Sequence, residues 1–228
     1  MKPVSAVIAD FDRIAGALGA QPSADVFSMA ERFLLSRVPA TAKQALDAGC
    51  GDGRISRALA RRGIHTVCLD VSPGMIALAR TRTPDAQRSL LEYRLGDIMT
   101  AQLEQRAYDL VISLSTAHHA PLGAFVQRLA GALAPGGTLL IQDVTTRYGM
   151  WHLPVNALAW LARRLRLVPA TEGRSPAIAA LYEAHGSGEE YLQASDVASV
   201  YRAILPDARV HLHLEWRYTV VWRRPNAS

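Results

Sequence analysis

Cysteine is scarce in this chain, because only Cys50 and Cys68 occur among 228 residues. Two cysteines cannot form the disulfide framework of a small secreted domain, so we expect a reducing, cytoplasmic location. The charged residues Asp10, Asp12 and Arg13 interrupt the first apolar stretch, and we therefore expect no signal peptide. No stretch reaches the run of about 18 apolar residues that a transmembrane helix needs, so we expect no membrane-spanning segment.

Lysine is nearly absent as well, occurring only as Lys2 and Lys43, so arginine carries almost all of the basic charge. The net charge of +5 is dispersed along the chain except for short arginine clusters at 61–62, 163–166 and 223–224. Nucleic-acid-binding proteins usually gather such charge on one surface, so we expect no nucleic-acid partner. The composition, with 50% hydrophobic and 20% charged residues, is typical of a globular protein. The length suits one domain covering residues 1–228.

Residues 45–56 read ALDAGCGDGRIS and are the most informative stretch of the sequence. A short apolar strand leads through alternating glycines into a helical pattern. Glycine is needed where the backbone turns tightly or approaches a ligand closely. The helix that follows directs free N–H groups and a partial positive charge at this turn. The turn can therefore hold a nucleotide-like ligand that carries a carboxylate or a phosphate, although an ordinary strand–helix turn is the alternative.

Two classes of cofactor compete for this loop. A dinucleotide-binding loop places a glycine or alanine three positions after its second glycine, where this chain has Arg54. The spacing here is G-x-G-x-G, and Asp47 precedes it. This pattern resembles the first motif of class I S-adenosylmethionine-dependent methyltransferases. In that family the acidic residue serves the methionyl end of the cofactor, and the glycines let the backbone pass close to it.

Later segments follow in the order typical of the same family. They are the strand-like stretch ending in Asp70, the Leu95–Ile98 stretch containing Asp97, the buried-strand run Tyr108–Ser113, and the Pro-Gly-Gly turn within Leu133–Ile141. An acid at a strand end can accept both hydroxyl groups of a ribose. The resemblance implies that Asp97 accepts the adenine amino group and that the next residue packs on the ring. It assigns these residues to S-adenosylmethionine, with S-adenosylhomocysteine as product: Asp47, Gly49, Cys50, Gly51, Gly53, Asp70, Val71, Asp97, Ile98 and Ser113.

The hydrophobic periodicity predicts an α/β fold. Expected strands at 44–48, 64–70, 90–96, 108–114 and 138–144 alternate with expected helices at 54–62, 73–82 and 122–134. Two further helices are expected at 4–18 and 24–37, and a short helix or crossover at 98–107. Such alternation implies a parallel sheet that binds ligands at the carboxyl ends of its strands. The stretch 208–223, with a bend near Glu215, resembles the family's final strand pair. We therefore expect a Rossmann-like, mostly parallel seven-stranded sheet with an antiparallel last strand.

Residues 146–194 interrupt this pattern, and we expect them to form a helical lid over the open end of the sheet. The stretch Trp151–Leu167 is apolar with a basic tail, so contact with a membrane surface is an alternative for it. Glycine, proline and serine in Glu172–Ser187 indicate a mobile loop. A lid admits ligands and then excludes water. We assign Ser115, Tyr148, Trp151 and His185 to the acceptor pocket, with core packing as the alternative role for the aromatic residues.

Methyl transfer from a sulfonium requires alignment of the nucleophile and exclusion of water, and a base only where the acceptor must lose a proton. His118 and His119 follow the fourth strand, and His119 is the favoured base. Packing or capping of the next helix is the alternative for both, and we expect at most one to face the methyl group. His185 lies near Glu189 and Glu190, but we expect no metal site because no third ligand is apparent.

The stretch Ser113–Thr116 differs from the Asn-Pro-Pro-Tyr string of enzymes that methylate nucleobase or glutamine amino groups. The leading hypothesis is therefore methyl transfer to an oxygen, nitrogen or carbon nucleophile of a small molecule, such as a secondary metabolite. Two alternatives remain open. One is an enzyme of the same fold that uses the bound cofactor for a cyclisation or elimination. The other is a non-catalytic cofactor-binding module, against which the intact set of glycines and acids argues.

Overall fold

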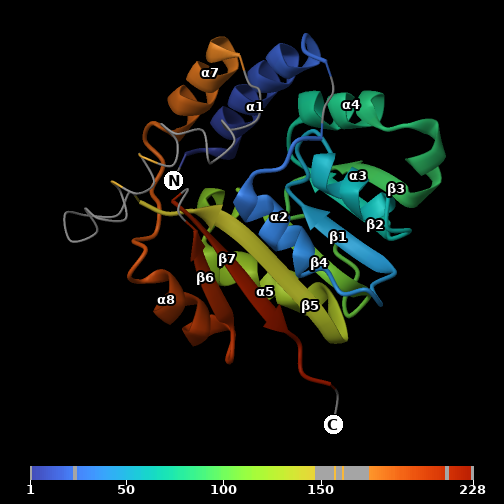
Figure 1. Cartoon of the computed structure of the whole chain (residues 1–228), viewed down its shortest axis with the longest axis vertical. Coiled ribbons are helices and arrows are strands. Elements are labelled where there is room, and N and C mark those ends of the chain that lie inside the picture. Colours follow the sequence, from blue (N-terminus) through green and yellow to red (C-terminus); the bar gives the residue numbers. More distant parts are fainter. Residues whose placement is uncertain are drawn as a thin grey trace.

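A computed structural model describes residues 2–22, 25–146, 157, 161, 175–213 and 216–226. Within these ranges the chain forms a seven-stranded sheet with the strand order β3-β2-β1-β4-β5-β7-β6 (Figure 1). Strands β1 to β5 pair in parallel, whereas β7 runs antiparallel to both β5 and β6. This confirms the expected Rossmann-like sheet. The strands are β1 (Gln44–Ala48), β2 (His65–Asp70), β3 (Leu91–Leu95), β4 (Tyr108–Leu114), β5 (Leu133–Val144), β6 (Arg209–His213) and β7 (Arg217–Arg223).

Helices cover both faces of the sheet and its open end. The α-helices are α1 (Val4–Gly19), α2 (Met29–Ser36), α3 (Arg54–Ala60), α4 (Pro73–Arg82), α5 (Leu122–Ala132), α7 (Pro176–Gly186) and α8 (Val197–Ile204). Two 3-10 helices are η1 (Asp85–Leu90) and η2 (Ala117–His119). Helix α1 packs against both α4 and α7, at the end of the molecule drawn uppermost in Figure 1. None of the described helices has both the length and the apolar character needed to cross a membrane.

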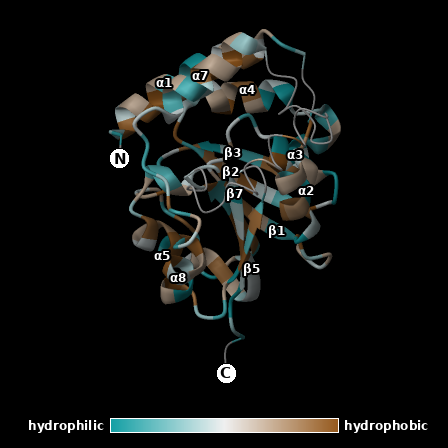
Figure 2. Ribbon diagram, turned by 60° about the vertical axis from the view of Figure 1, so that its left-hand side comes forward, coloured by the Kyte–Doolittle hydropathy of each residue, from teal (hydrophilic) through white to brown (hydrophobic). Residues whose placement is uncertain are grey.

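The apolar run of β4 arises because the strand is buried on both faces. Leu110 and Ile112 belong to a core with Leu34 and Leu59 from α2 and α3. Val111, which points the opposite way, belongs to a second core that includes α5. Successive side chains of a strand point to opposite faces, so a strand between two layers of helices must be apolar throughout. Figure 2 shows brown, hydrophobic segments in the strands as well as in the helices packed on them.

The start of α2 differs from the sequence expectation for a local reason. Helix α2 begins at Met29 instead of residue 24, because Ser28 and Glu31 form a capping box. The Ser28 side chain accepts from the Glu31 N–H at 3.2 Å, and the Glu31 carboxylate accepts from the Ser28 N–H at 2.9 Å. Residues 98–107 form turns and irregular chain, so they are a crossover and not a short helix.

The region expected to be a lid is described from residue 175 onward. The prediction of a mobile loop within Glu172–Ser187 is wrong for Pro176–Gly186, because these residues form helix α7. Ser175 caps this helix, and Pro176 occupies its first turn, where the missing N–H has no cost. Tyr148 and the stretch Trp151–Leu167 lie outside the described residues, except for positions 157 and 161.

The N-terminal helix α1 joins α7 as part of the same cover, which the sequence did not indicate. Asp12 fixes its position, because one carboxylate oxygen accepts from the Ser72 hydroxyl at 2.6 Å and from the Gly74 N–H at 2.9 Å. Both donors lie at the start of α4. The helix is therefore anchored to the end of the sheet that carries the expected cofactor residues.

Candidate active site

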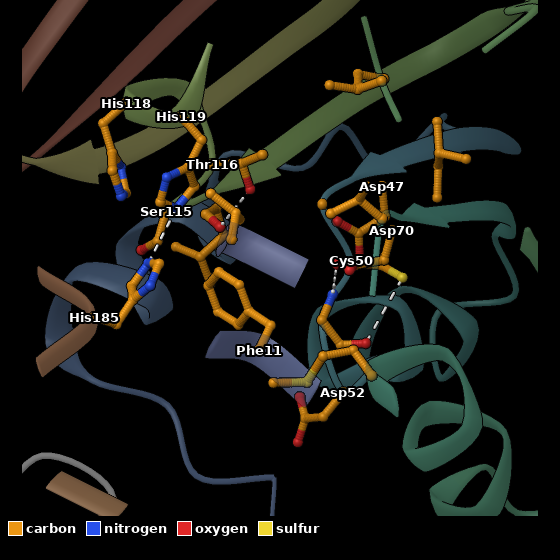
Figure 3. A pocket seen from close by; sticks show the side chains of 18 of the residues that line it. Phe11, Asp47, Cys50, Asp52, Asp70, Ser115, Thr116, His118, His119 and His185 are labelled. Atoms are coloured by element: carbon orange, nitrogen blue, oxygen red, sulfur yellow. Dashed lines mark hydrogen bonds between the residues drawn. The ribbon is translucent and has the colours of Figure 1, made fainter. Parts of the chain in front are cut away.

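A cavity of about 760 Å³ lies between the carboxyl ends of the strands and the cover formed by α1 and α7. Its volume is within the range of about 300–1,000 Å³ that is typical of ligand sites. Figure 3 shows acidic residues and Cys50 at one end and the histidines at the other. The cavity is lined by most of the expected site residues, namely Asp47, Gly49, Cys50, Gly51, Asp70, Val71, Asp97, Ile98, Ser115, His118, His119 and His185.

Two expected cofactor residues, Gly53 and Ser113, do not line this cavity. The Ser113 side chain is fully buried, and its hydroxyl donates to the Ala48 carbonyl at 2.8 Å between two strands. Gly53 precedes α3 with φ at +79°, and a Cβ there would lie 2.6 Å from the Tyr93 hydroxyl. Both residues therefore have packing roles that sequence alone does not separate from ligand contact. Tyr148 and Trp151 lie outside the described residues.

The glycine loop is shaped by close contact with the end of β4. Gly49 has φ at +79°, and a Cβ on it would lie 2.1 Å from Oγ1 of Thr116. Gly51 also has a positive φ, +54°, but a Cβ there would meet no protein atom within 4 Å. Gly49 is therefore required by packing as well as by backbone conformation. Gly51 leaves an open cradle beside the cavity, which suits a ligand that approaches the backbone.

Asp70 connects the glycine loop to the end of β2. Its two carboxylate oxygens accept from the Gly51 N–H at 2.8 Å and from the Ser72 N–H at 2.9 Å. Burial raises the pKa of Asp70 even though these backbone N–H groups favour the charged form. Each carboxylate oxygen can accept more than one hydrogen bond, so Asp70 can still accept ligand hydroxyl groups.

Asp47 is the most deeply buried acid of the glycine-loop end, with 1% of its surface exposed. Its carboxylate accepts from the Ser56 hydroxyl at 2.5 Å. Burial raises the pKa of Asp47 to about 7, with a contribution from the Asp70 charge and against the hydrogen bond from Ser56. A cation placed beside this carboxyl would favour its charged form. The acidic end of the cavity is therefore suited to a positively charged ligand.

The histidine end is built from η2, β5 and α7. Asp143 of β5 holds His118 twice, accepting from its backbone N–H at 2.9 Å and lying 2.7 Å from its Nδ1. His119 stacks beside His118, with ring centroids 3.9 Å apart. Its Nε2 lies 3.4 Å from Nε2 of His185 on α7. Both His118 and His119 line the cavity.

The pKa values of these two neighbouring rings are shifted in opposite directions. Burial lowers the pKa of His118, but the Asp143 carboxylate outweighs this effect and the net pKa is raised. Burial, together with the His118 and His185 rings, lowers the pKa of His119 to about 3. His119 is therefore neutral near pH 7, with a lone pair on one ring nitrogen.

Several residues at the histidine end were missed by the sequence analysis. Asp10 and Phe11 come from α1, where Asp10 lies 3.0 Å from Nδ1 of His185 and Phe11 packs on the same ring at 4.6 Å. A periodic helix near the N-terminus gives no signal for such a contact. Asp143 did carry a signal, because an acid near the end of an apolar strand is the pattern that identified Asp70.

The comparisons with known proteins agree with the geometry of the glycine-loop end. The sequence model of a family described as "Methyltransferase domain" matches residues 46–141. An uncharacterized methyltransferase of Mycobacterium tuberculosis is 30% identical over 201 residues, which cover 86% of this chain and 94% of that protein. The chain belongs to the class I S-adenosylmethionine-dependent methyltransferase family. It is thus an enzyme of the methyltransferase class, as the motifs predicted.

One further relative and two solved structures are also similar to this chain. A ubiquinone biosynthesis O-methyltransferase of Xylella fastidiosa is 31% identical over 135 residues, which cover 58% of this chain and 54% of that protein. The structure of DhpI with S-adenosylhomocysteine has a TM-score of 0.63 at 20% identity, covering 99% of this chain and 98% of DhpI. The [4+2]-cyclase SpnF has a TM-score of 0.67 at 14% identity, with the same coverage. At such identities these structures show a shared fold alone, and a fold does not determine a reaction.

Proposed function

We propose that this methyltransferase binds S-adenosylmethionine at the acidic end of the cavity and methylates a small molecule held at the histidine end. The nucleophile is an oxygen, nitrogen or carbon atom of that molecule. One observation carries the proposal: a single cavity joins the glycine loop and its acids to the histidines beneath α1 and α7. Cofactor and acceptor can therefore meet in one covered space, which is what methyl transfer requires.

The residues of the acidic end fit the cofactor. Bound S-adenosylmethionine supplies an electrophilic methyl group on a positively charged sulfur. Its cationic methionyl end suits the buried Asp47, and the open cradle at Gly51 admits close approach to the backbone. Asp70 accepts the ribose hydroxyls, and Asp97 accepts the adenine amino group. Asp97 lines the cavity, and its carboxylate already accepts from the Met99 N–H at 2.8 Å.

The histidine end suits a small acceptor because the whole cavity, at about 760 Å³, is within the range typical of small-molecule sites. Phe11 and Tyr182 from the two helices of the cover line the cavity, together with Ser115 and Tyr191. The Ser115 hydroxyl accepts from the Arg217 guanidinium at 2.9 Å, which fixes one polar group at the floor. An acceptor with an aromatic or apolar body and one polar nucleophile fits this lining. The role of His119 as general base stays a prediction.

The test combines binding with product analysis on the full chain. Isothermal calorimetry should detect both S-adenosylmethionine and S-adenosylhomocysteine, and no heat with either ligand at millimolar concentration would contradict the proposal. Incubation with a panel of phenols, carboxylic acids and amines should then release S-adenosylhomocysteine and add one methyl group to the product, as read by mass spectrometry. A changed acceptor without release of S-adenosylhomocysteine would instead indicate a cyclisation or elimination.

A further inference from the structure

Three histidines from distant parts of the chain meet at the acceptor end of the cavity. His118 and His119 lie in η2 and His185 lies on α7, and one ring nitrogen of each lies within 4.8 Å of those of the other two. Figure 3 shows the three rings together beside Ser115 and Phe11. The sequence predicted no metal site because no further ligand was apparent near His185. The tertiary structure supplies such ligands, since it brings His119, 66 residues earlier in the chain, beside His185.

Each of these histidines has a carboxylate beside its Nδ1 atom. Asp143 lies 2.7 Å from Nδ1 of His118, and Asp10 lies 3.0 Å from Nδ1 of His185. Glu189 lies 3.5 Å from Nδ1 of His119. A hydrogen-bonded carboxylate, as at His118 and His185, holds the ring proton on Nδ1 and leaves Nε2 with its lone pair. Glu189 is placed to favour the same tautomer at His119. The same carboxylate–histidine arrangement orients and strengthens the histidine ligands of metal sites in proteins.

The spacing of two rings matches that of ligands on one ion. The Nε2 atoms of His119 and His185 lie 3.4 Å apart. With their protons on Nδ1, both Nε2 atoms present lone pairs, and neither has a proton to donate to the other. Two nitrogens bound tetrahedrally to zinc at about 2.0–2.1 Å lie about 3.4 Å from each other. An ion bound to both nitrogens would therefore satisfy both lone pairs at the separation that the two atoms already have.

Glu189 provides an independent sign of an incomplete site. Its side chain is fully buried, and neither carboxylate oxygen has a hydrogen-bond partner among the described residues. Nδ1 of His119 is likewise buried without a partner, although the Glu189 carboxylate is its neighbour. The Lys2 ammonium is 4.0 Å from Glu189 and is shared with Asp10. Unpaired buried polar groups are costly. A metal ion on Nε2 of His119 would polarise its Nδ1–H toward Glu189 and so compensate both groups.

We propose that His118, His119 and His185 bind one divalent transition-metal ion at the acceptor end of the cavity. Imidazole nitrogens suit zinc, cobalt, nickel or ferrous iron, whereas magnesium and calcium prefer oxygen ligands. Three protein ligands leave at least one coordination position open, as in catalytic zinc sites.

The open coordination position would bind the acceptor, an inference that rests on the proposed function. It selects an acceptor with an oxygen donor, such as a phenol or enol hydroxyl, because coordination lowers the pKa of a bound hydroxyl. With His119 as a metal ligand, the hydroxyl proton is lost to solvent and not to His119, and the oxygen attacks the methyl carbon of S-adenosylmethionine. The carbon–sulfur bond then breaks with its electron pair on sulfur, which yields the methyl ether and S-adenosylhomocysteine.

The test titrates the chelator-treated full chain with cobalt(II) alone and reads the visible absorption bands, followed by displacement with zinc(II). We expect one equivalent to bind with the spectrum of low-coordinate cobalt. His119→Ala should abolish this spectrum. The matched control is His65→Ala, which removes an exposed histidine at the start of β2 and should leave the spectrum unchanged. Asp10→Asn keeps all three ligands and should weaken cobalt binding by roughly 10- to 100-fold through the loss of a carboxylate partner.

Calorimetry with S-adenosylhomocysteine separates folding and cofactor binding from metal binding. Wild-type affinity for S-adenosylhomocysteine in the His119 variant shows that the fold is intact; if that variant unfolds, Asp10→Asn decides instead. The inference is overturned if the wild type gives no cobalt spectrum. It is also overturned if the spectrum persists in His119→Ala and the cobalt affinity is unchanged in Asp10→Asn. Either result means that the two rings share a proton. Metal binding without S-adenosylhomocysteine binding would refute the proposed function and leave the metal site standing.

Discussion

The two ends of the cavity are built in different ways. The cofactor end comes from short stretches at the ends of β1, β2 and β3, where backbone groups and nearby acids do most of the work. The histidine end is assembled from side chains of α1, η2, β5 and α7, whose partners are far apart in the chain. A change at the cofactor end should therefore act through backbone geometry and charge. A change at the histidine end should act through side-chain contacts and spare the cofactor.

The largest effect is expected from Gly49→Ala, because Gly49 needs both a positive φ and space beside Thr116. Left-handed strain costs about 1–2 kcal/mol and overpacking about 1–3 kcal/mol. Chemical unfolding should therefore show a loss of roughly 2–5 kcal/mol, together with lost cofactor binding. The matched variant is Gly51→Ala. Its added Cβ would have no protein atom within 4 Å, so only the backbone strain should destabilise it. Equal stability of the two variants would remove the role assigned to Thr116.

Asp70→Ala is expected to weaken S-adenosylhomocysteine binding by roughly 1.5–3 kcal/mol, the range for hydrogen bonds to a charged group. The loss has two sources, namely the ribose contact and the anchoring of the loop through the Gly51 N–H. Calorimetry measures it. Asp109→Ala serves as a control, since Asp109 accepts from the Lys43 and Gln44 N–H groups, away from the cavity. An unchanged affinity in a folded Asp70 variant would show that this acid has a structural role only.

A pH dependence is expected from Asp47, whose pKa burial raises to about 7. In the free protein the carboxyl group is therefore largely protonated below about pH 7. The cationic S-adenosylmethionine favours the charged form, so its binding should release a proton there. Affinity should rise with pH up to about 7 and then level off. Calorimetry in buffers with different ionisation enthalpies measures the proton, and Asp47→Asn should lose the release. A pH-independent affinity in the wild type would contradict this assignment.

Asp47 should also affect the stability of the free protein, which is expected to fall with rising pH where the cofactor affinity rises. The folded pKa of Asp47 lies above its ordinary value of 3.8, so between these two pH values the unfolded state loses the proton first. The contribution of Asp47 to stability is therefore full below the ordinary value and is lost as pH rises toward about 7. Urea unfolding across this window measures the slope, which Asp47→Asn should reduce. An equal slope in the variant would assign the effect to other groups.

The smallest effect is expected from Phe11→Leu, which alters the contacts with the His185 and His119 rings. The acceptor should show a raised KM, while the affinity for S-adenosylhomocysteine stays at the wild-type value. Steady-state kinetics with the best acceptor of the panel and calorimetry measure the two quantities. A weaker cofactor affinity in this variant would show that the two ends of the cavity are not independent.

Local patterns carried the prediction of the fold and of the glycine loop. The apolar run of β4 indicated a strand buried on both faces, as its contacts with Leu59 and α5 confirm. Local patterns gave a wrong prediction where the same residue type can either contact a ligand or pair within the fold. Ser113 ends a strand as a ligand residue would, yet its hydroxyl pairs with the Ala48 carbonyl. The sequence placed His118 and His119 after the fourth strand, but it gave no sign that Asp143 holds His118 in place at the cavity.

The sequence by itself determined the sheet, the turn at Gly49–Gly53 and the acids at the strand ends, because these depend on residues within one strand–turn–helix unit. Only the tertiary structure decided that α1 covers the cavity, that Asp10 and Phe11 reach His185, and that the three histidines meet. These contacts depend on how α1 docks on α4 through Asp12 and on where α7 lies against it. Docking of this kind is set by packing between distant surfaces, which leaves no spacing pattern along the chain.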